Sequence, residues 1–115
     1  MAHYLLQTAY TKTAWVAMTR SPHNRLDALR PVVQRLGGSV VNAWMSFGDY
    51  DFLLICELPD NVSAAALSMA VSSGGAVKAV KTTPLLSMEE GLEALTKVSE
   101  AEYEPPPTEF PYFGA

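Results

Sequence analysis

The chain has 115 residues, of which 49% are hydrophobic and 17% charged, and its formal net charge is −4. This length fits one domain with a core of its own. The charged fraction lies below the ~25% of a typical domain, which predicts that another subunit covers part of the surface. The acidic balance, with no basic stripe, argues against nucleic acid as a partner.

The single cysteine, Cys56, lies inside an apolar run. This setting favours a small buried hydrophobic residue over a reactive thiol. One cysteine excludes an internal disulfide and is typical of a reducing compartment. The first residues lack the pattern of a signal peptide, and no apolar run approaches the ~18 residues that a membrane span needs. We therefore expect a cytoplasmic protein without a membrane partner.

The spacing of apolar residues predicts four strands and four helical segments. In chain order we expect a strand over 3–10, a helical turn over 13–19, a helix over 21–36, strands over 39–47 and 52–58, a helix over 62–73, a strand over 77–86 and a helix from 87 to 97. Apart from the helical turn and the extra C-terminal helix, this order is that of the ferredoxin-like α+β fold, βαββαβ. Its four-stranded antiparallel sheet carries the helices on one face.

Capping residues mark the predicted helix ends. Ser21 is expected to cap the second helix, with Pro22 at the first helical position, where the missing N–H costs nothing. Pro31 inside this helix should kink or divide it, because proline removes a backbone donor. Ser87 and Glu90 have the spacing of a capping box.

Gly48-Asp49-Tyr50-Asp51 separates the second and third predicted strands and predicts a hairpin. Gly48 and Asp49 are the expected turn residues, because glycine accepts the positive φ of the primed turns. Counting outward, one face pairs Phe47 with Tyr50, Met45 with Phe52, Ala43 with Leu54 and Val41 with Cys56. The other pairs Ser46 with Asp51, Trp44 with Leu53, Asn42 with Ile55 and Val40 with Glu57.

Both predicted faces of the hairpin are largely apolar, yet two helices can cover only one face of a sheet. An exposed face that carries Trp44 and Leu53 marks an interface. We therefore predict a homodimer or a higher homo-oligomer. Between the packed sheets we expect a core or a small cavity, lined by Trp44, Asn42, Asp51, and Gln7 or Thr8.

Candidate chemistry in that cavity rests on few residues. Asp51 is a candidate acid or base, because removal from water tunes a carboxylate for proton transfer. The favoured alternative is that its carboxylate binds backbone N–H groups at the turn or pairs with an arginine. Tyr50 is a candidate ligand donor, although packing on Phe47 is favoured. His3, which begins the first strand, is a candidate at the cavity mouth.

The sequence gives no support for a metal site or a cofactor site. His3 and His23 are the two histidines, and neither has a partner at ligand spacing. A nucleophile elbow, a phosphate loop and a dinucleotide fingerprint are all absent from the sequence. We therefore expect no metal and no cofactor.

The chain resembles the GYD-domain family over roughly residues 3–95. The resemblance rests on Ser21-Pro22 with Arg25-Leu26, Leu36-Gly37-Gly38, Gly48-Asp49-Tyr50-Asp51, Pro59-Asp60 and Gly75-Ala76-Val77. It implies membership of the dimeric α/β-barrel group of ferredoxin-like proteins, in which two sheets pack face to face. The family has no established general activity, so the resemblance implies a fold and an assembly rather than a reaction.

We expect a GYD-like domain over residues 1–98 and a C-terminal arm over 99–115. Prolines 105 to 107 force an extended path in this arm. Its aromatic residues are more than a disordered tail usually carries, so we expect them to dock on the same chain or on a neighbouring subunit. These residues are Tyr103, Phe110, Tyr112 and Phe113.

Three functions are compatible with these patterns. The favoured one is an oligomeric module that binds a small, partly apolar molecule or a protein partner. The second is a cofactor-independent enzyme acting on a small aromatic or polyketide-like substrate in the barrel cavity, as the resemblance to the wider superfamily implies. The third is a purely structural self-assembly domain.

Overall fold

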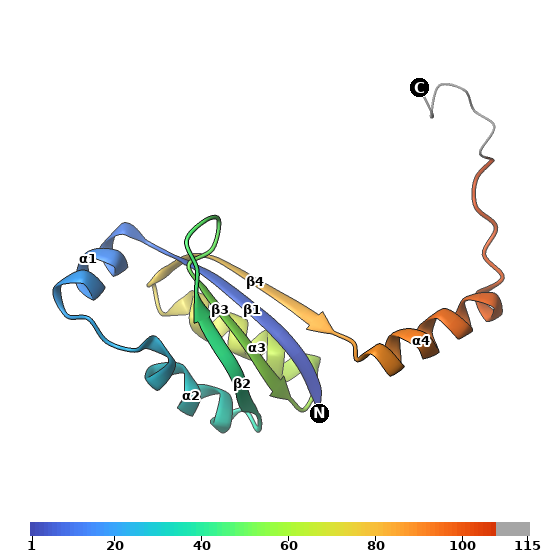
Figure 1. The fold of residues 1–115 in the computed structure, drawn as a ribbon, viewed down its shortest axis with the longest axis horizontal. Coiled ribbons are helices and arrows are strands. Elements are labelled where there is room, and N and C mark those ends of the chain that lie inside the picture. The colour runs from blue at the N-terminus through green and yellow to red at the C-terminus, as the bar shows by residue number, and fades with distance from the viewer. Residues whose placement is uncertain (108–115) are drawn as a thin grey trace. The chain divides into compact units, whose positions relative to one another are not determined.

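The computed structural model describes residues 1–107. The elements are β1 (Ala2–Tyr10), α1 (Lys12–Arg20), α2 (Arg25–Arg35), β2 (Ser39–Met45), β3 (Phe52–Leu58), α3 (Asn61–Ser73), β4 (Val77–Leu85), α4 (Met88–Lys97) and the 3₁₀ turn η1 (Val98–Ala101), as Figure 1 shows. The chain divides into a compact unit that ends at Leu85 and a second unit that begins at Leu86.

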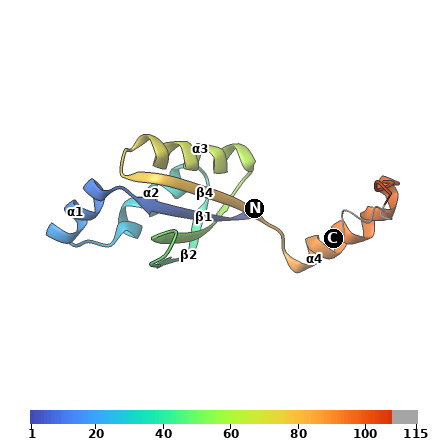
Figure 2. The ribbon, with the colours of Figure 1, turned by 90° about the horizontal axis from the view of Figure 1, so that it is seen from above.

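The first unit is built on a four-stranded sheet with the order β2-β3-β1-β4, in which every neighbouring pair is antiparallel. This order confirms the predicted ferredoxin-like arrangement. Figure 2 shows α3 lying along one side of the sheet. Val33 of α2 and Leu67 of α3 belong to one buried cluster with alternate residues of β1 and β3, so both helices cover the same face.

Alternation of buried and partly exposed residues along β1 and β3 separates the two faces of the sheet, except at the end of β1, where Thr8, Ala9 and Tyr10 are all buried. The residues that point toward the helices are buried, and those between them are mostly partly exposed. The helix-covered face contributes Tyr4, Leu6, Thr8, Tyr10, Phe52, Leu54, Cys56 and Leu58. Cys56 is completely buried, as its apolar surroundings in the sequence predict.

The connection between β2 and β3 differs from the predicted two-residue turn. It is a loop over residues 46–51, closed by a hydrogen bond from Ser46 N to Asp51 O of 2.9 Å and one from Ser46 Oγ to Tyr50 O of 2.7 Å. Gly48 does not adopt the positive φ that the prediction required. The Ser46 hydroxyl donates to the Tyr50 carbonyl within this loop, which is wider than a two-residue turn, and the side chain of Phe47 is fully exposed.

Pairing of β2 with β3 follows the predicted register only near the loop. Met45 lies opposite Phe52, Trp44 opposite Leu53, Ala43 opposite Leu54 and Asn42 opposite Ile55, as predicted. A bulge between Val40 and Asn42 then shifts the register, so Val40 pairs with Cys56 and Ser39 with Glu57. The predicted pairs Val41–Cys56 and Val40–Glu57 are wrong, because a bulge inserts one extra residue into one strand.

The second helix begins later than the sequence suggested. Asn24, not Ser21, is the cap of α2, and its Oδ1 accepts a hydrogen bond of 2.9 Å from Leu26 N. Ser21 instead ends α1, where its N–H donates to the carbonyl of Ala17. The helix α2 continues through Pro31 rather than dividing there.

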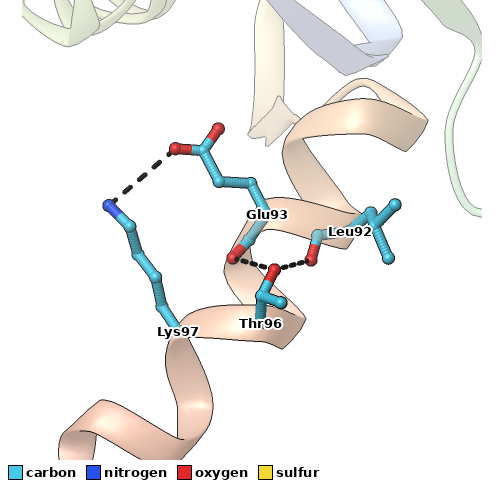
Figure 3. Close-up of polar contacts among 4 residues, drawn as sticks. All are labelled: Leu92, Glu93, Thr96 and Lys97. Atoms are coloured by element: carbon cyan, nitrogen blue, oxygen red, sulfur yellow. Dashed lines mark hydrogen bonds and ion pairs between the residues drawn. The ribbon is translucent and has the colours of Figure 1, made fainter.

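The second unit contains α4, which begins with the predicted capping box of Ser87 and Glu90. Figure 3 shows three polar contacts near its C-terminal end, one of them from Thr96 Oγ1 to Glu93 O at 3.0 Å. Thr96 Oγ1 lies 2.7 Å from Leu92 O, and Lys97 Nζ lies 3.9 Å from Glu93 Oε1. These contacts are local to the helix.

Within the described part of the chain, no helix combines the length and the apolar character that crossing a membrane requires. Three aromatic residues of the predicted docking arm, Phe110, Tyr112 and Phe113, lie outside the described residues.

Candidate functional site

Most of the site residues predicted from the sequence lie on the face of the sheet that the helices leave uncovered, which we call the open face. Three rows cross it from strand to strand. They are Trp44–Leu53–Gln7–Lys81, Asn42–Ile55–Leu5–Thr83 and Ser39–Glu57–His3–Leu85. Trp44 is 50% exposed, so the apolar part of this face is open in the single chain.

Two polar side chains on the open face, those of His3 and Asn42, have partners within the chain. His3 Nε2 lies 3.2 Å from Glu57 Oε1. Asn42 Oδ1 accepts a hydrogen bond of 2.8 Å from Ala43 N. Gln7 occupies the row of Trp44 but is separated from it by Leu53. The rows form a surface, and the cavities described below are lined by other residues.

Asp51 lies where β1 ends and β3 begins, and its carboxylate completes the backbone pairing there. Its Oδ2 accepts a hydrogen bond of 2.9 Å from Tyr10 N, and its own N–H donates to Thr8 O over 2.8 Å. The carboxylate thus binds a backbone N–H group, but one from β1 rather than one of its own turn. Tyr50 lies half-buried in the loop beside it.

A cavity of about 220 Å³ lies on the helix-covered side, between α2, α3 and the sheet, and we call it the inner cavity. Its wall is mainly apolar. The lining residues are Thr8, Tyr10, Arg25, Ala28, Leu29, Val32, Ala70, Val71, Gly74, Ala76 and Val77.

A second cavity, of about 420 Å³, lies between α1, the segment that joins α1 to α2, and the ends of β2 and β3, and we call it the outer cavity. Aromatic and sulfur-containing side chains dominate its wall. The lining residues are Tyr10, Trp15, Met18, Thr19, Pro22, His23, Asn24, Arg25, Met45 and Phe52. Tyr10 and Arg25 line both cavities.

Tyr10 is the last residue of β1 and is almost completely buried. Burial raises the pKa of its hydroxyl, and the Arg25 charge, with nearby hydrogen-bonding groups of Thr8 and Arg25, offsets part of this rise. The phenol therefore stays neutral near pH 7 and keeps a proton to donate. Its ring meets the ring of Trp15 edge-on, with centroids 5.5 Å apart and planes at 88°, which fixes its direction.

Arg25 is the first residue of α2 and is half-buried. Its Nη1 lies 3.2 Å from His23 Nε2, which must accept because a guanidinium only donates. His23 Nδ1 lies 3.0 Å from Ser21 O, and this contact holds the ring beside the arginine. Within residues 1–107 no carboxylate forms an ion pair with Arg25.

Thr8 brings a buried hydroxyl to the inner cavity. It is 2% exposed, and its Oγ1 has no hydrogen-bond partner of ordinary geometry in the described chain. The Tyr10 hydroxyl lies near enough for Thr8 to affect its pKa. A buried polar atom without a partner is rare and marks a place where a ligand or a water completes the structure.

The sequence did not point to Tyr10, Trp15 or Arg25 as site residues, although Arg25 is among the residues that carry the family resemblance, and it placed Thr8 on the opposite face. One signal for Arg25 was present. It follows the cap of a helix, where the helix dipole disfavours a cation, so a reason other than helix stability is expected for an arginine there. Tyr10 and Thr8 carry no such signal, because only the folded strand shows which face they occupy.

Comparison with protein-family models finds a match to the model described as GYD domain, over residues 4–95. The match spans the sheet, the first three helices and most of α4, and it includes Tyr10 and Arg25. A search of curated proteins finds no match. No group of three or more histidine, cysteine or acidic residues suited to hold a metal occurs in the part of the chain that the structure describes.

Proposed function

We propose that this chain, which belongs to the GYD domain family, is a binding module for a small, partly apolar molecule. The ligand occupies the inner and outer cavities on the helix-covered side of the sheet. The observation that carries this proposal is the meeting of three polar side chains, Thr8, Tyr10 and Arg25, in an otherwise apolar wall. Small-molecule sites have this composition, with a few placed polar groups among apolar ones.

The sizes of the two cavities support a ligand rather than isolated water. The inner cavity, at about 220 Å³, is several times the ~30 Å³ that one water occupies in the liquid. The outer cavity, at about 420 Å³, falls within the range of about 300–1,000 Å³ that is common for ligand sites.

The open face supports a second part of the proposal, self-association of the module. It carries Trp44, Leu53, Ile55 and Leu5 in adjacent rows, while the helices pack on the other face. A second copy packed sheet against sheet would cover this apolar surface. Assembly and ligand binding then use opposite sides of the sheet.

A fragment screen by NMR on the full-length chain tests the binding function. We expect small aromatic and aliphatic fragments to shift the amide signals of Tyr10, Trp15 and Val32, with little effect on those of Trp44 and Ile55. A screen in which fragments bind only the open face contradicts the proposed site. A screen without binders favours the purely structural function, and turnover of a bound fragment favours the enzyme.

Two substitutions in α2 provide a matched pair for this screen. Ala28→Trp places a large ring at the wall of the inner cavity, whereas Gln34→Trp adds the same ring at an exposed position that lines neither cavity. We expect the first to weaken fragment binding at least about tenfold, a cost of ~1.4 kcal/mol, and the second to leave it unchanged. Equal effects of the two substitutions contradict binding in the inner cavity.

A further inference from the structure

We infer that the ligand of the inner cavity is a small carboxylic acid with an apolar body, whose carboxylate is held by Arg25, Tyr10 and Thr8. This inference rests on the binding function proposed above and adds the chemical class of the ligand. It follows from the charge, the hydrogen-bonding capacity and the size of the inner cavity.

The charge of the cavity requires an anion. Arg25 is half-buried, lines both cavities and has no carboxylate partner within residues 1–107, although the chain carries 12 acidic residues against 8 basic ones. Its hydrogen-bond partners among the described side chains are His23 and Tyr10, and neither is a carboxylate. A guanidinium that is partly removed from water is stabilised by a hydrogen-bonded counter-ion, and a carboxylate matches its planar fork.

The hydrogen-bonding groups at the cavity all have a proton to give. A guanidinium only donates, and the buried Tyr10 phenol keeps its proton at neutral pH. The Thr8 hydroxyl lies near the Tyr10 oxygen but forms no hydrogen bond of ordinary geometry among the described residues, so it can turn its proton toward a ligand oxygen. An ionised carboxylate accepts hydrogen bonds only, and its two oxygens can serve all three donors.

A carboxylate fits this site better than a phosphate. A phosphate monoester carries about −1.5 to −2 charges near pH 7, and one arginine would leave part of that charge unbalanced in an apolar cavity. The rest of the wall is formed by apolar side chains, among them Leu29, Val32, Val71 and Val77. These apolar side chains favour a ligand with an apolar body. A cavity of about 220 Å³ limits that body to a single small ring or a short chain.

Calorimetric titration of the full-length chain with matched probes tests the inference. The probes are benzoate, phenylacetate and hexanoate, each against its neutral amide, and inorganic phosphate. We expect at least one acid to bind about tenfold or more tightly than its amide, since a charge-assisted hydrogen bond exceeds a neutral one by about this factor. Inorganic phosphate should bind more weakly than that acid.

Variants assign the effect to the named side chains. Arg25→Gln should weaken acid binding about 10- to 100-fold and leave amide binding within about threefold. Arg30→Gln, at an exposed position of the same helix, is the matched control and should change neither. Thr8→Val should weaken acid binding about 2- to 10-fold while raising the melting temperature of the free protein, because it removes a buried hydroxyl without a partner. A Thr8 with a purely structural role would alter the melting temperature alone.

The possible outcomes separate the inference from the proposed function. If acids and amides bind equally well, the inference of a carboxylic acid ligand is wrong and the proposed binding function remains. Phosphate that binds more tightly than every acid also overturns the carboxylate. If neither acids nor amides bind up to about 10 mM, both the inference and the proposed function fail for ligands of this size.

Discussion

The two faces of the sheet are made by the same strands but differ in what covers them. On the helix-covered face, Leu6 and Leu54 are completely buried, and a cavity remains beside Thr8. On the open face, Trp44 is half-exposed and no helix of the first unit packs on its row. An apolar residue at every second position therefore does not distinguish a core from an interface, because both need the same alternation.

The two faces also differ in whether their polar side chains have partners, and here the helix-covered side is the less complete one. On the open face, His3 meets Glu57 and Asn42 meets a backbone N–H group. On the helix-covered side, the hydroxyl of Thr8 lacks a partner and Arg25 lacks a carboxylate within residues 1–107. A buried polar group without a partner is unusual, and this difference is why we propose ligand binding on the helix-covered side and association on the open face.

The largest expected effect comes from neighbouring leucines of β3 that face opposite ways. Leu54→Ala should lower the free energy of unfolding by about 2–5 kcal/mol, because it empties part of a closed core. Leu53→Ala, on the open face, should cost about 1 kcal/mol in a dilute single chain. Urea denaturation at low and high protein concentration measures both. Equal costs at low concentration would show that the two faces are equally covered.

Trp44→Ala tests the open face as an association surface. If a second copy packs there, loss of this large aromatic side chain should weaken self-association by about 2 kcal/mol or more, roughly 30-fold. Light scattering across a concentration series measures it, with Val41→Ala, at the exposed bulge, as the control. A wild-type chain that remains monomeric at micromolar concentration and above contradicts the proposed assembly.

The elements of the first unit were largely predictable from the sequence, because they follow from local patterns. The alternation in β3, the glycine that ends α2 with a φ of 87° and the cap at Asp60 are each set by a few adjacent residues. The loop after Met45 was not predictable in this way. Glycine followed by aspartate is typical of a primed turn, but Gly48 has no positive φ, and the loop instead contains a hydrogen bond from Ser46 Oγ to the Tyr50 carbonyl.

The candidate site could not be predicted from the sequence for a different reason. The register of the hairpin correctly sorted Trp44 and Asn42 onto one face, but it contained no information on where space remains. The inner cavity depends on how α2 and α3 lie relative to each other over β1, which is a property of tertiary packing. Thr8 was therefore predictable as a strand residue but not as a polar group without a partner.

Alkaline pH tests how tightly the helices seal their face. Burial raises the pKa of the Cys56 thiol from an ordinary 9.0 to about 11. As pH rises from 9 to 11, the unfolded chain loses this proton while the folded chain keeps it, so stability should fall by about 2–3 kcal/mol. Below pH 9 both states hold the proton and the thiol has no effect on the pH dependence.

Cys56→Ala should remove the thiol's contribution to the fall in stability at alkaline pH. The contribution of Tyr10, whose pKa is also raised, should remain. The comparison uses the slope of unfolding free energy against pH, because the substitution also lowers stability at every pH by enlarging a core space. The same slope in both proteins, or rapid reaction of the native thiol with a disulfide reagent at pH 8, would show that the helix-covered face is open.

The smallest expected effect concerns Asp51, which the sequence made the chief candidate for chemistry. Its carboxylate accepts the Tyr10 N–H at 2.9 Å, so Asp51→Asn, which keeps an acceptor oxygen, should cost only about 1 kcal/mol. Binding of the acids that Arg25 holds should stay within about threefold, because Asp51 lines neither the inner nor the outer cavity. Thermal unfolding and the same calorimetric titration measure the two effects, with Asp49→Asn in the exposed part of the loop as the control. A large loss of acid binding in Asp51→Asn with unchanged stability would show that Asp51 takes part in ligand binding. It would contradict a site confined to the inner and outer cavities.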